Sequence, residues 1–405
     1  MNLVRRRLSQ GELDVLIAAH ERLADGRPGG RRLMLKFMDL SGLNLSGRRL
    51  AESDFSGCSL EDARLAGACM NGAVLFCADL RGADFTGAEL VRADLRGASL
   101  RGAIMTNADL TRADFREGVI AVPHATRGLT AVRHEARQGS ADGATLDGGQ
   151  LEGISARKAD FTDCSLGGAN LSRANLQEAI LTGAMMENAS VDRCNLQGAR
   201  MTGAILTGVT LELADTKGAD LTGVLRSPGE EALARAEDLA ERALDANAWA
   251  ESGGVFGEPA TFDGEDLRPL GDRLKDLKLP GLSARHACFA GMDLRGASLQ
   301  GAGLEGADLR GCDLRGADLR GVRLNGALLN RADLRGANLG ALAISKDRFM
   351  PATLVEAILR FARLEGTIFD GARLDGADVS GARVDPEALT TEQRQAILTS
   401  AEMAA

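Results

Sequence analysis

The chain is 405 residues long, contains 50 Gly and no Tyr, and has an aromatic content of only 3%. So few aromatic rings cannot supply the stacking platforms on which proteins hold single-stranded bases. The formal net charge of −9 and the isoelectric point near 5.2 argue against a general nucleic-acid binder, which would carry a basic stripe. No apolar run reaches the roughly 18 residues of a membrane span, so we expect no membrane association and a cytoplasmic location.

The first segment, 1–34, is predicted to be an N-terminal helical cap. Residues 9–24 have the pattern of an amphipathic helix that ends near Gly26. Its apolar stripe consists of Leu13, Leu16, Ile17, His20 and Leu23. A helix at this position would cover the open end of the structure that follows it.

A large apolar residue recurs at every fifth position from Leu35 to Ile120, typically in the word A-D-L-R-G. In an extended conformation the Ala and Leu of a word point to one side and the Asp to the other, while the Gly allows a corner. Strands this short cannot stand alone, so successive coils must stack and pair their backbones about 4.8 Å apart. The same period defines three repeat runs, at 35–120, 146–225 and 289–384.

Three stretches show the pattern A-(D/N)-(L/F)-x-x most clearly: CADLRGADFTGAEL, GCDLRGADLRGVRL and FTDCSLGGANLSRANL. This pattern resembles that of the pentapeptide-repeat family. The resemblance implies an all-β solenoid, a right-handed quadrilateral parallel β-helix in which four words form one coil. For this chain we expect such a β-helix with short helical caps and a partly helical central insert.

Residues 121–145 interrupt the period and are predicted to be a loop. The stretch AVPHATRGLTAVRHEARQGS at this break is dense in basic side chains. The candidate partner contacts in it are His124, Arg127, Arg133, His134 and Arg137. The segment is either a projecting loop that contacts a partner or a surface excursion with ordinary solvated charges.

Residues 226–288 form the second interruption. The stretch EALARAEDLAERALDANAW is helix-like, and a G-x-x-G motif follows it, as one also follows the N-terminal helix. This similarity indicates an internal duplication, with a cap and repeat coils in 1–225 and again in 226–405. We therefore assign 226–288 to a helical insert or second cap, and a plain linker is the alternative.

The third run, 289–384, keeps the period without a miss. With four words in each coil, Asp293, Asp313 and Asp333 would form one row, and the Arg two positions after each of them would form a parallel row. The run contains 13 Lys and Arg against 12 Asp and Glu. Neighbouring opposite charges are therefore expected to compensate one another along this run.

The end of the chain combines a predicted helix with apolar residues at outward positions. The segment 385–405 is predicted to be a C-terminal helix, with Asp385 as its N-cap and Pro386 at its first position. The apolar candidates for a partner contact are Met350, Val355, Ile358, Phe361 and Ile368. Such a patch marks an interface if it is exposed, and the alternative is that the C-terminal helix folds back over it.

The sequence contains no constellation of residues that predicts catalysis. Carboxylates repeat in outward rows, whereas general acid–base catalysis needs two carboxyl groups whose environments separate their pKa values. Four of the seven Cys stand where a word normally has Ala, so they are predicted to be core residues. We expect no enzymatic activity, no cofactor and no metal site.

We therefore expect a bacterial, cytoplasmic, non-enzymatic scaffold that binds a protein partner of unknown identity and makes no direct contact with nucleic acid. A homodimer through the C-terminal region is a further possibility that the sequence leaves open. The alternative function comes from the resemblance, because some members of the family mimic duplex DNA, bind DNA gyrase and protect it from quinolones. Mimicry of this kind requires an uncompensated acidic surface, which the near-neutral third run does not predict.

Overall fold

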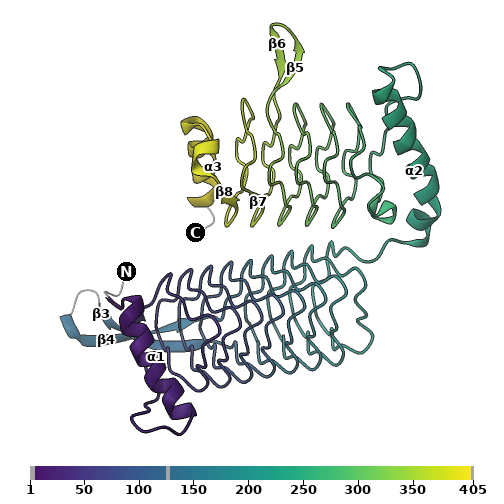
Figure 1. Cartoon of the computed structure of the whole chain (residues 1–405). Helices are drawn as coiled ribbons and strands as arrows, with labels where there is room; N and C mark the ends of the chain where they lie inside the picture. The colour runs from purple at the N-terminus through teal and green to yellow at the C-terminus, as the bar shows by residue number, and fades with distance from the viewer. Residues whose placement is uncertain (1–4, 125–127, 403–405) are drawn as a thin grey trace. The chain divides into compact units, whose positions relative to one another are not determined.

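The computed structural model describes residues 5–124 and 128–402 of the chain. The chain divides into two compact units, Met1–Ser227 and Pro228–Ala405, which are called unit 1 and unit 2 below. Figure 1 shows that each unit contains a stack of narrow coils with few regular strands. No helix among the described residues has both the length and the apolar character that crossing a membrane requires.

One coil takes four words in both units, because residues four words apart pair as parallel β-bridges. In unit 1, Val74 pairs with Asp54 on the coil before it and with Asp94 on the coil after it. In unit 2, Asp313 pairs in the same way with Asp293. Each word of the sequence therefore contributes one bridge and one turn, and four words complete a coil.

The inward positions of the words form a continuous apolar core in each unit. Leu80, Phe85 and Leu90, from three successive words, are fully buried. The corner residue of a word adopts the left-handed conformation, with a φ of 63° at Gly87 and 55° at Asp62. Glycine enters this conformation without steric strain, which explains its abundance in the sequence.

Unit 1 begins with β1 (Arg6–Arg7), α1 (Gln10–Ala24) and β2 (Met38–Asp39). β1 pairs in parallel with β2, so Arg6 and Arg7 lie on the edge of the first coil. Ser9 caps α1, and its side chain forms a reciprocal capping box with Glu12.

The buried face of α1 is narrower than the sequence predicts. Leu13, Ile17 and His20 are buried as expected. The exposed fraction is 39% for Leu16 and 46% for Leu23, so the prediction that these two leucines belong to the packed stripe is wrong. Leu13, Ile17 and His20 lie three or four positions apart, so they form one narrow stripe on the helix. This stripe alone packs against the coil.

The predicted loop at 121–145 is wrong, because β3 (Gly118–His124) and β4 (Gly128–Arg137) form an antiparallel hairpin there. The valines and the threonine of this segment favour strands, which the loop prediction ignored. The coils resume after the hairpin, where Ser140 pairs with Ser99. Ile120 therefore belongs to β3, although it matched the period of five.

Unit 2 begins with α2 (Glu230–Glu251), whose buried residues are Leu239, Ala240, Ala243 and Ala246. Asn247 Oδ1 accepts a hydrogen bond of 2.8 Å from the backbone N–H of Lys278, which ties α2 to the first coil. In Figure 1, α2 and the C-terminal helix lie at opposite ends of the coils of unit 2.

The helical insert or second cap predicted at 226–288 is too long, because coils already begin where Thr261 pairs with Ser283. These partners lie further apart in the sequence than the usual four words, and the short 3-10 helix η1 (Arg268–Leu270) lies between them. The additional length shifts the period, so the core residues are Leu274 and Leu279. In the sequence this first coil is therefore marked only by a broken five-residue period at Phe262, Leu267, Leu277 and Leu282.

A second hairpin interrupts the third run, which was predicted to be continuous over 289–384. β5 (Leu342–Ser345) and β6 (Arg348–Met350) pair antiparallel, and Figure 1 shows them standing away from the coils of unit 2. Ile344 and Phe349 match the period of five, but their exposed fractions are 53% and 63%. The β-bridges between coils skip the hairpin residues, because Arg323 pairs with Thr353, six words further on, and not with a residue four words further on.

The last coil contains β7 (Arg363–Leu364) and β8 (Arg383–Val384), which pair in parallel. The 3-10 helix η2 (Pro386–Ala388) and α3 (Thr391–Glu402) follow. Asp385 is thus the N-cap of η2, so the prediction that it caps the C-terminal α-helix is wrong.

Thr390 and Gln393 explain where α3 begins. The backbone N–H of Thr390 donates to Gln393 Oε1 at 2.9 Å, and the backbone N–H of Gln393 donates to Thr390 Oγ1 at 3.2 Å. This reciprocal pair is a capping box, which Asp385 followed by Pro386 does not offer. Gln393 Nε2 also donates to the carbonyl oxygens of Phe369 and Ala372, both at 2.9 Å, and so holds α3 against the coils.

Candidate interaction surfaces

The first set of predicted contact residues lies on the hairpin β3–β4. His124 ends β3 opposite Gly128, while Arg133 and His134 of β4 pair with Val122 and Ala121. Arg137 is the last residue of β4 and is half-buried. Arg127 lies outside the described residues.

The base of β3–β4 closes against a corner of the coils at Gly97. A Cβ atom at Gly97 would lie 2.8 Å from Cys77 Sγ and 3.0 Å from the carbonyl oxygen of Arg137. A Cβ atom at Gly118 would lie 2.9 Å from the ring of Phe76. Glycine at these positions therefore allows the hairpin to approach the coil closely.

The second set of predicted contact residues does not form one exposed surface. The ring of Phe361 covers the space beside Gly381 and receives the guanidinium groups of Arg331 and Arg360 at 5.8 and 5.9 Å. Val355 and Ile358 are half-buried on the coils, whereas Ile368 is 45% exposed. Ile368 is thus the most accessible member of this set.

Met350, the remaining member, lies at the base of the hairpin β5–β6. A Cβ atom at Gly301 or at Gly321 would lie 3.0 Å from Met350 Cε, and one at Gly321 would lie 2.8 Å from Leu342 Cβ. Leu342 and Met350 are also register partners in the hairpin. The base of the hairpin is therefore packed onto two successive glycine corners.

The most exposed large side chains of this hairpin, Ile344 and Phe349, were missed by the sequence reasoning. They lie on either side of Lys346 and Asp347, which form the turn. The signal that could have found them is the position two residues before each, where Ala usually stands and where this chain has Leu342 and Asp347. A second exposed apolar pair, Val255 and Phe256, follows α2 with exposed fractions of 72% and 70%.

The two predicted rows of opposite charge are present on unit 2. The side chain of Arg315 binds Asp313 with both Nε and Nη2, at 2.9 and 2.6 Å, and its Nε also lies 3.9 Å from Asp333. Arg295 contacts Asp293 and Asp313 in the same manner. The bidentate contact with Arg295 lowers the pKa of Asp293 to about 2, which keeps this carboxylate ionised.

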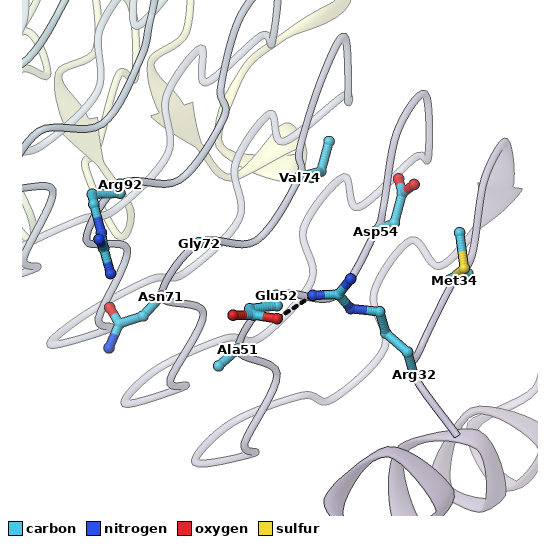
Figure 2. Close-up of a pocket in the computed structure, with 9 residues that line it drawn as sticks. All are labelled: Arg32, Met34, Ala51, Glu52, Asp54, Asn71, Gly72, Val74 and Arg92. Carbon is cyan, nitrogen blue, oxygen red and sulfur yellow. Dashed lines mark hydrogen bonds and ion pairs between the residues drawn. The ribbon is translucent and has the colours of Figure 1, made fainter. Parts of the chain in front are cut away.

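A hollow of about 570 Å³ lies on unit 1 around Gly72 (Figure 2). Its lining residues are Arg32, Met34, Ala51, Glu52, Asp54, Asn71, Gly72, Val74 and Arg92. Nothing in the sequence reasoning selected it, because its residues become neighbours only when successive coils stack. The four-word spacing between Glu52, Gly72 and Arg92 is the signal that could have found it.

Asp54 in this hollow is an ionised group with local partners. Burial raises its pKa, but hydrogen bonds from Ser56 and the ammonium group of Lys36 outweigh burial, so the pKa lies below its ordinary value. The Ser56 backbone N–H donates to Asp54 Oδ1 at 3.0 Å, and Lys36 Nζ lies 3.0 Å from Asp54 Oδ2. Both carboxylate oxygens are therefore occupied.

The cysteines lie in environments that suppress thiolate chemistry. The thiols of Cys164 and Cys312 donate to the carbonyl oxygens of Ala141 and Phe289, at 2.7 and 3.0 Å. Burial raises the pKa of Cys194 to about 12. Within 5–124 and 128–402, no three His, Cys, Asp or Glu side chains gather in a way that could hold a metal ion.

The comparison with protein families finds one model, described as pentapeptide repeats, which matches the chain in eight copies and covers more than half of it. The matched residues are 39–75, 78–116, 157–192, 186–223, 283–316, 312–340 and 349–384. The gaps between these matches contain α2, the hairpin β3–β4 and most of β5–β6. None of the curated proteins that were compared with the chain matches it.

Solved structures of similar proteins include QnrB1, described as a plasmid-mediated fluoroquinolone resistance protein. It is 23% identical over 51% of this chain and 97% of its own, with a TM-score of 0.32. HetL, a pentapeptide repeat protein involved in heterocyst differentiation regulation in the cyanobacterium Nostoc, is 21% identical over 91% of this chain and 97% of its own, with a TM-score of 0.15. A pentapeptide repeat protein from the cyanobacterium Cyanothece is 26% identical over 33% of this chain and 91% of its own, with a TM-score of 0.21.

Proposed function

The chain belongs to the pentapeptide-repeat family, and from this premise we propose that it is a non-enzymatic cytoplasmic scaffold that binds a protein partner. In this proposal the two units are right-handed quadrilateral β-helices, and the partner contacts the hairpin β5–β6 of unit 2. The coils supply rigidity, and the hairpin supplies the contact.

One observation carries the proposal: a hairpin with exposed apolar side chains is fixed on a rigid base. Ile344 and Phe349 expose 53% and 63% of their surface, while Leu342 and Met350 pack onto the coil beneath them. Aromatic and aliphatic side chains on a fixed backbone lose little conformational entropy when they bind. Side chains of this kind are also the usual energetic centres of protein interfaces.

The coil faces support this choice of contact, because many of their charges are already paired within the chain. Asp293 and Asp313 each share their carboxylates with one or two arginines. A partner that used these groups would have to replace bidentate ion pairs that already exist. Recognition is therefore assigned to the hairpin, where the pattern of words is broken.

Affinity capture tests the contact. The tagged full chain, the double variant Ile344→Ser/Phe349→Ser and the control double variant Val255→Ser/Phe256→Ser are each used as bait in lysate of the native organism. We expect a protein that the unchanged chain and the control capture equally and that the hairpin variant loses by at least about tenfold. Equal capture by the hairpin variant would rule out β5–β6 as the contact.

The alternative function, mimicry of duplex DNA toward gyrase or another topoisomerase, receives less support. It requires an acidic surface without compensating cations, whereas the Asp rows of unit 2 are neutralised by adjacent Arg rows. A gyrase supercoiling assay separates the two functions. We expect no inhibition and no protection from quinolones at micromolar protein, and either effect would favour the alternative.

A further inference from the structure

The hollow around Gly72 exists because one side chain is missing from a row. Arg32, Glu52, Gly72 and Arg92 recur at every fourth word of the sequence and line the hollow together. Three of these residues have long side chains, and Gly72 has none. Figure 2 shows the resulting gap, with Glu52 on one side of Gly72 and Arg92 on the other.

Charges in the hollow are balanced except at Arg92. Arg32 and Glu52 form an ion pair with each other, and Lys36 pairs with Asp54. Arg92 is exposed and forms no ion pair or hydrogen bond through its side chain with any described residue. The hollow therefore contains one uncompensated guanidinium group, which favours an anionic ligand with a planar pair of acceptor oxygens.

The opposite wall of the hollow has two apolar side chains, Met34 and Val74, on the coils before and after Asp54. Met34 exposes 58% of its surface, and Val74 is half-buried one coil further on from Asp54. Asn71 offers little to a ligand, because its amide group already donates to Glu89 at 2.8 Å and accepts from the backbone of Val91 at 2.9 Å. A ligand would therefore find a cation on one side and, on the other, a thioether and a branched aliphatic group separated by Asp54, whose carboxylate is already paired within the chain.

We infer that this hollow binds an extended segment of a protein partner that carries a carboxylate side chain and an aliphatic one two positions apart, so that both point to the same face. The carboxylate accepts hydrogen bonds from Arg92, and the aliphatic side chain packs onto Val74, two positions from Gly72, over the space that this glycine leaves. The inference rests on the proposed function, since it takes the ligand to be a protein, but it concerns unit 1 and not the hairpin of unit 2.

Two substitutions test the hollow without disturbing the coil. Gly72→Gln fills it, and the backbone accepts the change because Glu52 and Arg92 of the same row already adopt φ values of 57° and 58°. A Cβ atom at Gly72 would lie 3.7 Å from Glu52 Cγ, which is an ordinary contact distance. Arg92→Gln removes the free charge and leaves the shape of the hollow.

Each substitution has a matched control in unit 1. Gly87→Gln places the same side chain at another left-handed corner, where nothing lies within 4 Å. Arg193→Gln removes another exposed corner arginine of the same row that has no ion pair with a described residue. The controls make the same change in charge and in backbone strain outside the hollow. They therefore distinguish a loss of binding at the hollow from an effect of charge or strain on the whole protein.

The probe is a fluorescein-labelled peptide in which glutamate and leucine stand two positions apart with serine between them, and fluorescence anisotropy measures its binding to the full chain. We expect saturable binding that Gly72→Gln and Arg92→Gln each weaken at least about tenfold, as expected for the loss of a charge-assisted hydrogen bond. The two control variants should bind within about twofold of the unchanged chain. A peptide with glutamine in place of glutamate should bind as weakly as Arg92→Gln does to the original peptide.

Three outcomes would overturn the inference: no binding of the peptide, equal weakening by the controls, or equal binding of the glutamine peptide. A double-stranded DNA oligonucleotide is measured in parallel, and tighter Arg92-dependent binding of the DNA would also overturn it, in favour of a phosphate ligand. Thermal unfolding checks that each variant is folded. If Gly72→Gln does not fold, Arg92→Gln still tests the inference. The hairpin variant Ile344→Ser/Phe349→Ser should bind the peptide as the unchanged chain does. The proposed contact at the hairpin and the proposed site in the hollow can therefore be disproved independently.

Discussion

Each unit carries one hairpin inserted into its coils, and the two insertions differ in length. In unit 1, Ser99 pairs with Ser140, whereas an uninterrupted coil would pair it with position 119. In unit 2, Arg323 pairs with Thr353 in place of position 343, so this insertion spans two whole words. The first insertion does not span a whole number of words. This difference explains why the sequence revealed the break at β3–β4 and concealed the one at β5–β6.

The two hairpins share the way in which they join the coil. Each closes on a corner glycine, Gly97 in unit 1 and Gly321 in unit 2, where the atoms of the hairpin occupy the space of an absent side chain. We therefore expect substitutions at the junctions to destabilise the protein more than the same substitutions at open corners.

The largest effect is expected at the junction of β3–β4. A methyl group at Gly139 would overlap the backbone carbonyl oxygen of Phe115, which cannot move without distorting the coil. Gly139→Ala should lower the free energy of unfolding by about 3 kcal/mol. The matched control, Gly102→Ala, has open space around it and should lose about 1 kcal/mol through left-handed strain alone.

Urea unfolding followed by circular dichroism measures both variants. Equal losses for Gly139→Ala and Gly102→Ala would contradict the close approach between the hairpin and the coil. A loss for Gly139→Ala that exceeds the loss for Gly102→Ala by about 2 kcal/mol would support it.

A smaller effect is expected at the junction of β5–β6. Gly321 and Gly316 have nearly the same φ, 68° and 65°, but only Gly321 lies under the hairpin. Gly321→Ala should therefore be less stable than Gly316→Ala by about 1 kcal/mol, because Leu342 and Met350 must shift. Limited proteolysis should also cleave near Lys346 and Arg348 faster in Gly321→Ala, and unchanged cleavage would argue against the packed base.

The helices at the start of the two units differ in their response to pH. His20 of α1 is buried, and its Nδ1 accepts a hydrogen bond of 3.1 Å from the backbone N–H of Leu33, so the folded chain holds it neutral. Burial lowers the pKa of His20, with Glu21, Arg32 and Arg49 as the charged groups that also act on it. The buried residues of α2 are not titratable.

The unfolded chain therefore binds a proton below its ordinary His pKa of 6.5 that the folded chain does not bind. The stability of unit 1 should be fully present above this pH and should fall as the pH drops from 7 to 5. His20→Gln, which cannot titrate, should show a shallower decrease over the same range in urea unfolding. An identical slope in the two proteins would contradict the role of His20.

The smallest effect on stability is expected from removal of the hairpin β5–β6. Deletion of the segment 341–350 restores the four-word spacing between coil partners, so the core of unit 2 should remain intact. The free energy of unfolding should change by less than about 1 kcal/mol. A large loss, or loss of cooperative unfolding, would show that the hairpin supports the coil and is not an addition to it.

The period of five predicted the coils, because an inward Leu, an outward Asp and a corner Gly are local requirements of every word. The period did not predict which of the apolar residues that match it lie outside the core. Ile344 and Phe349 obey the period as well as Leu354 does, yet only Leu354 is buried. The difference arises two positions earlier, where Leu354 has the small residue Ala352 but Ile344 and Phe349 have Leu342 and Asp347. A search for apolar spacing alone does not detect this change.

The hollow at Gly72 shows a second limit. Its residues are ordinary when each word is considered alone, and the site appears only when residues four words apart are compared. The predicted Asp and Arg rows of unit 2 were found by that comparison. At the corner residues of unit 1, the four-word spacing places one glycine, Gly72, between Glu52 and Arg92.

The central claim is that the hairpin β5–β6 touches a protein partner, and photo-cross-linking in living cells tests it most directly. A photo-reactive phenylalanine analogue replaces Phe349 in one protein and Phe256 in the other, since both side chains are highly exposed, at 63% and 70%. The account predicts a discrete cross-linked protein from position 349 that is absent at position 256. No adduct at 349, or the same adduct at both positions, would contradict it.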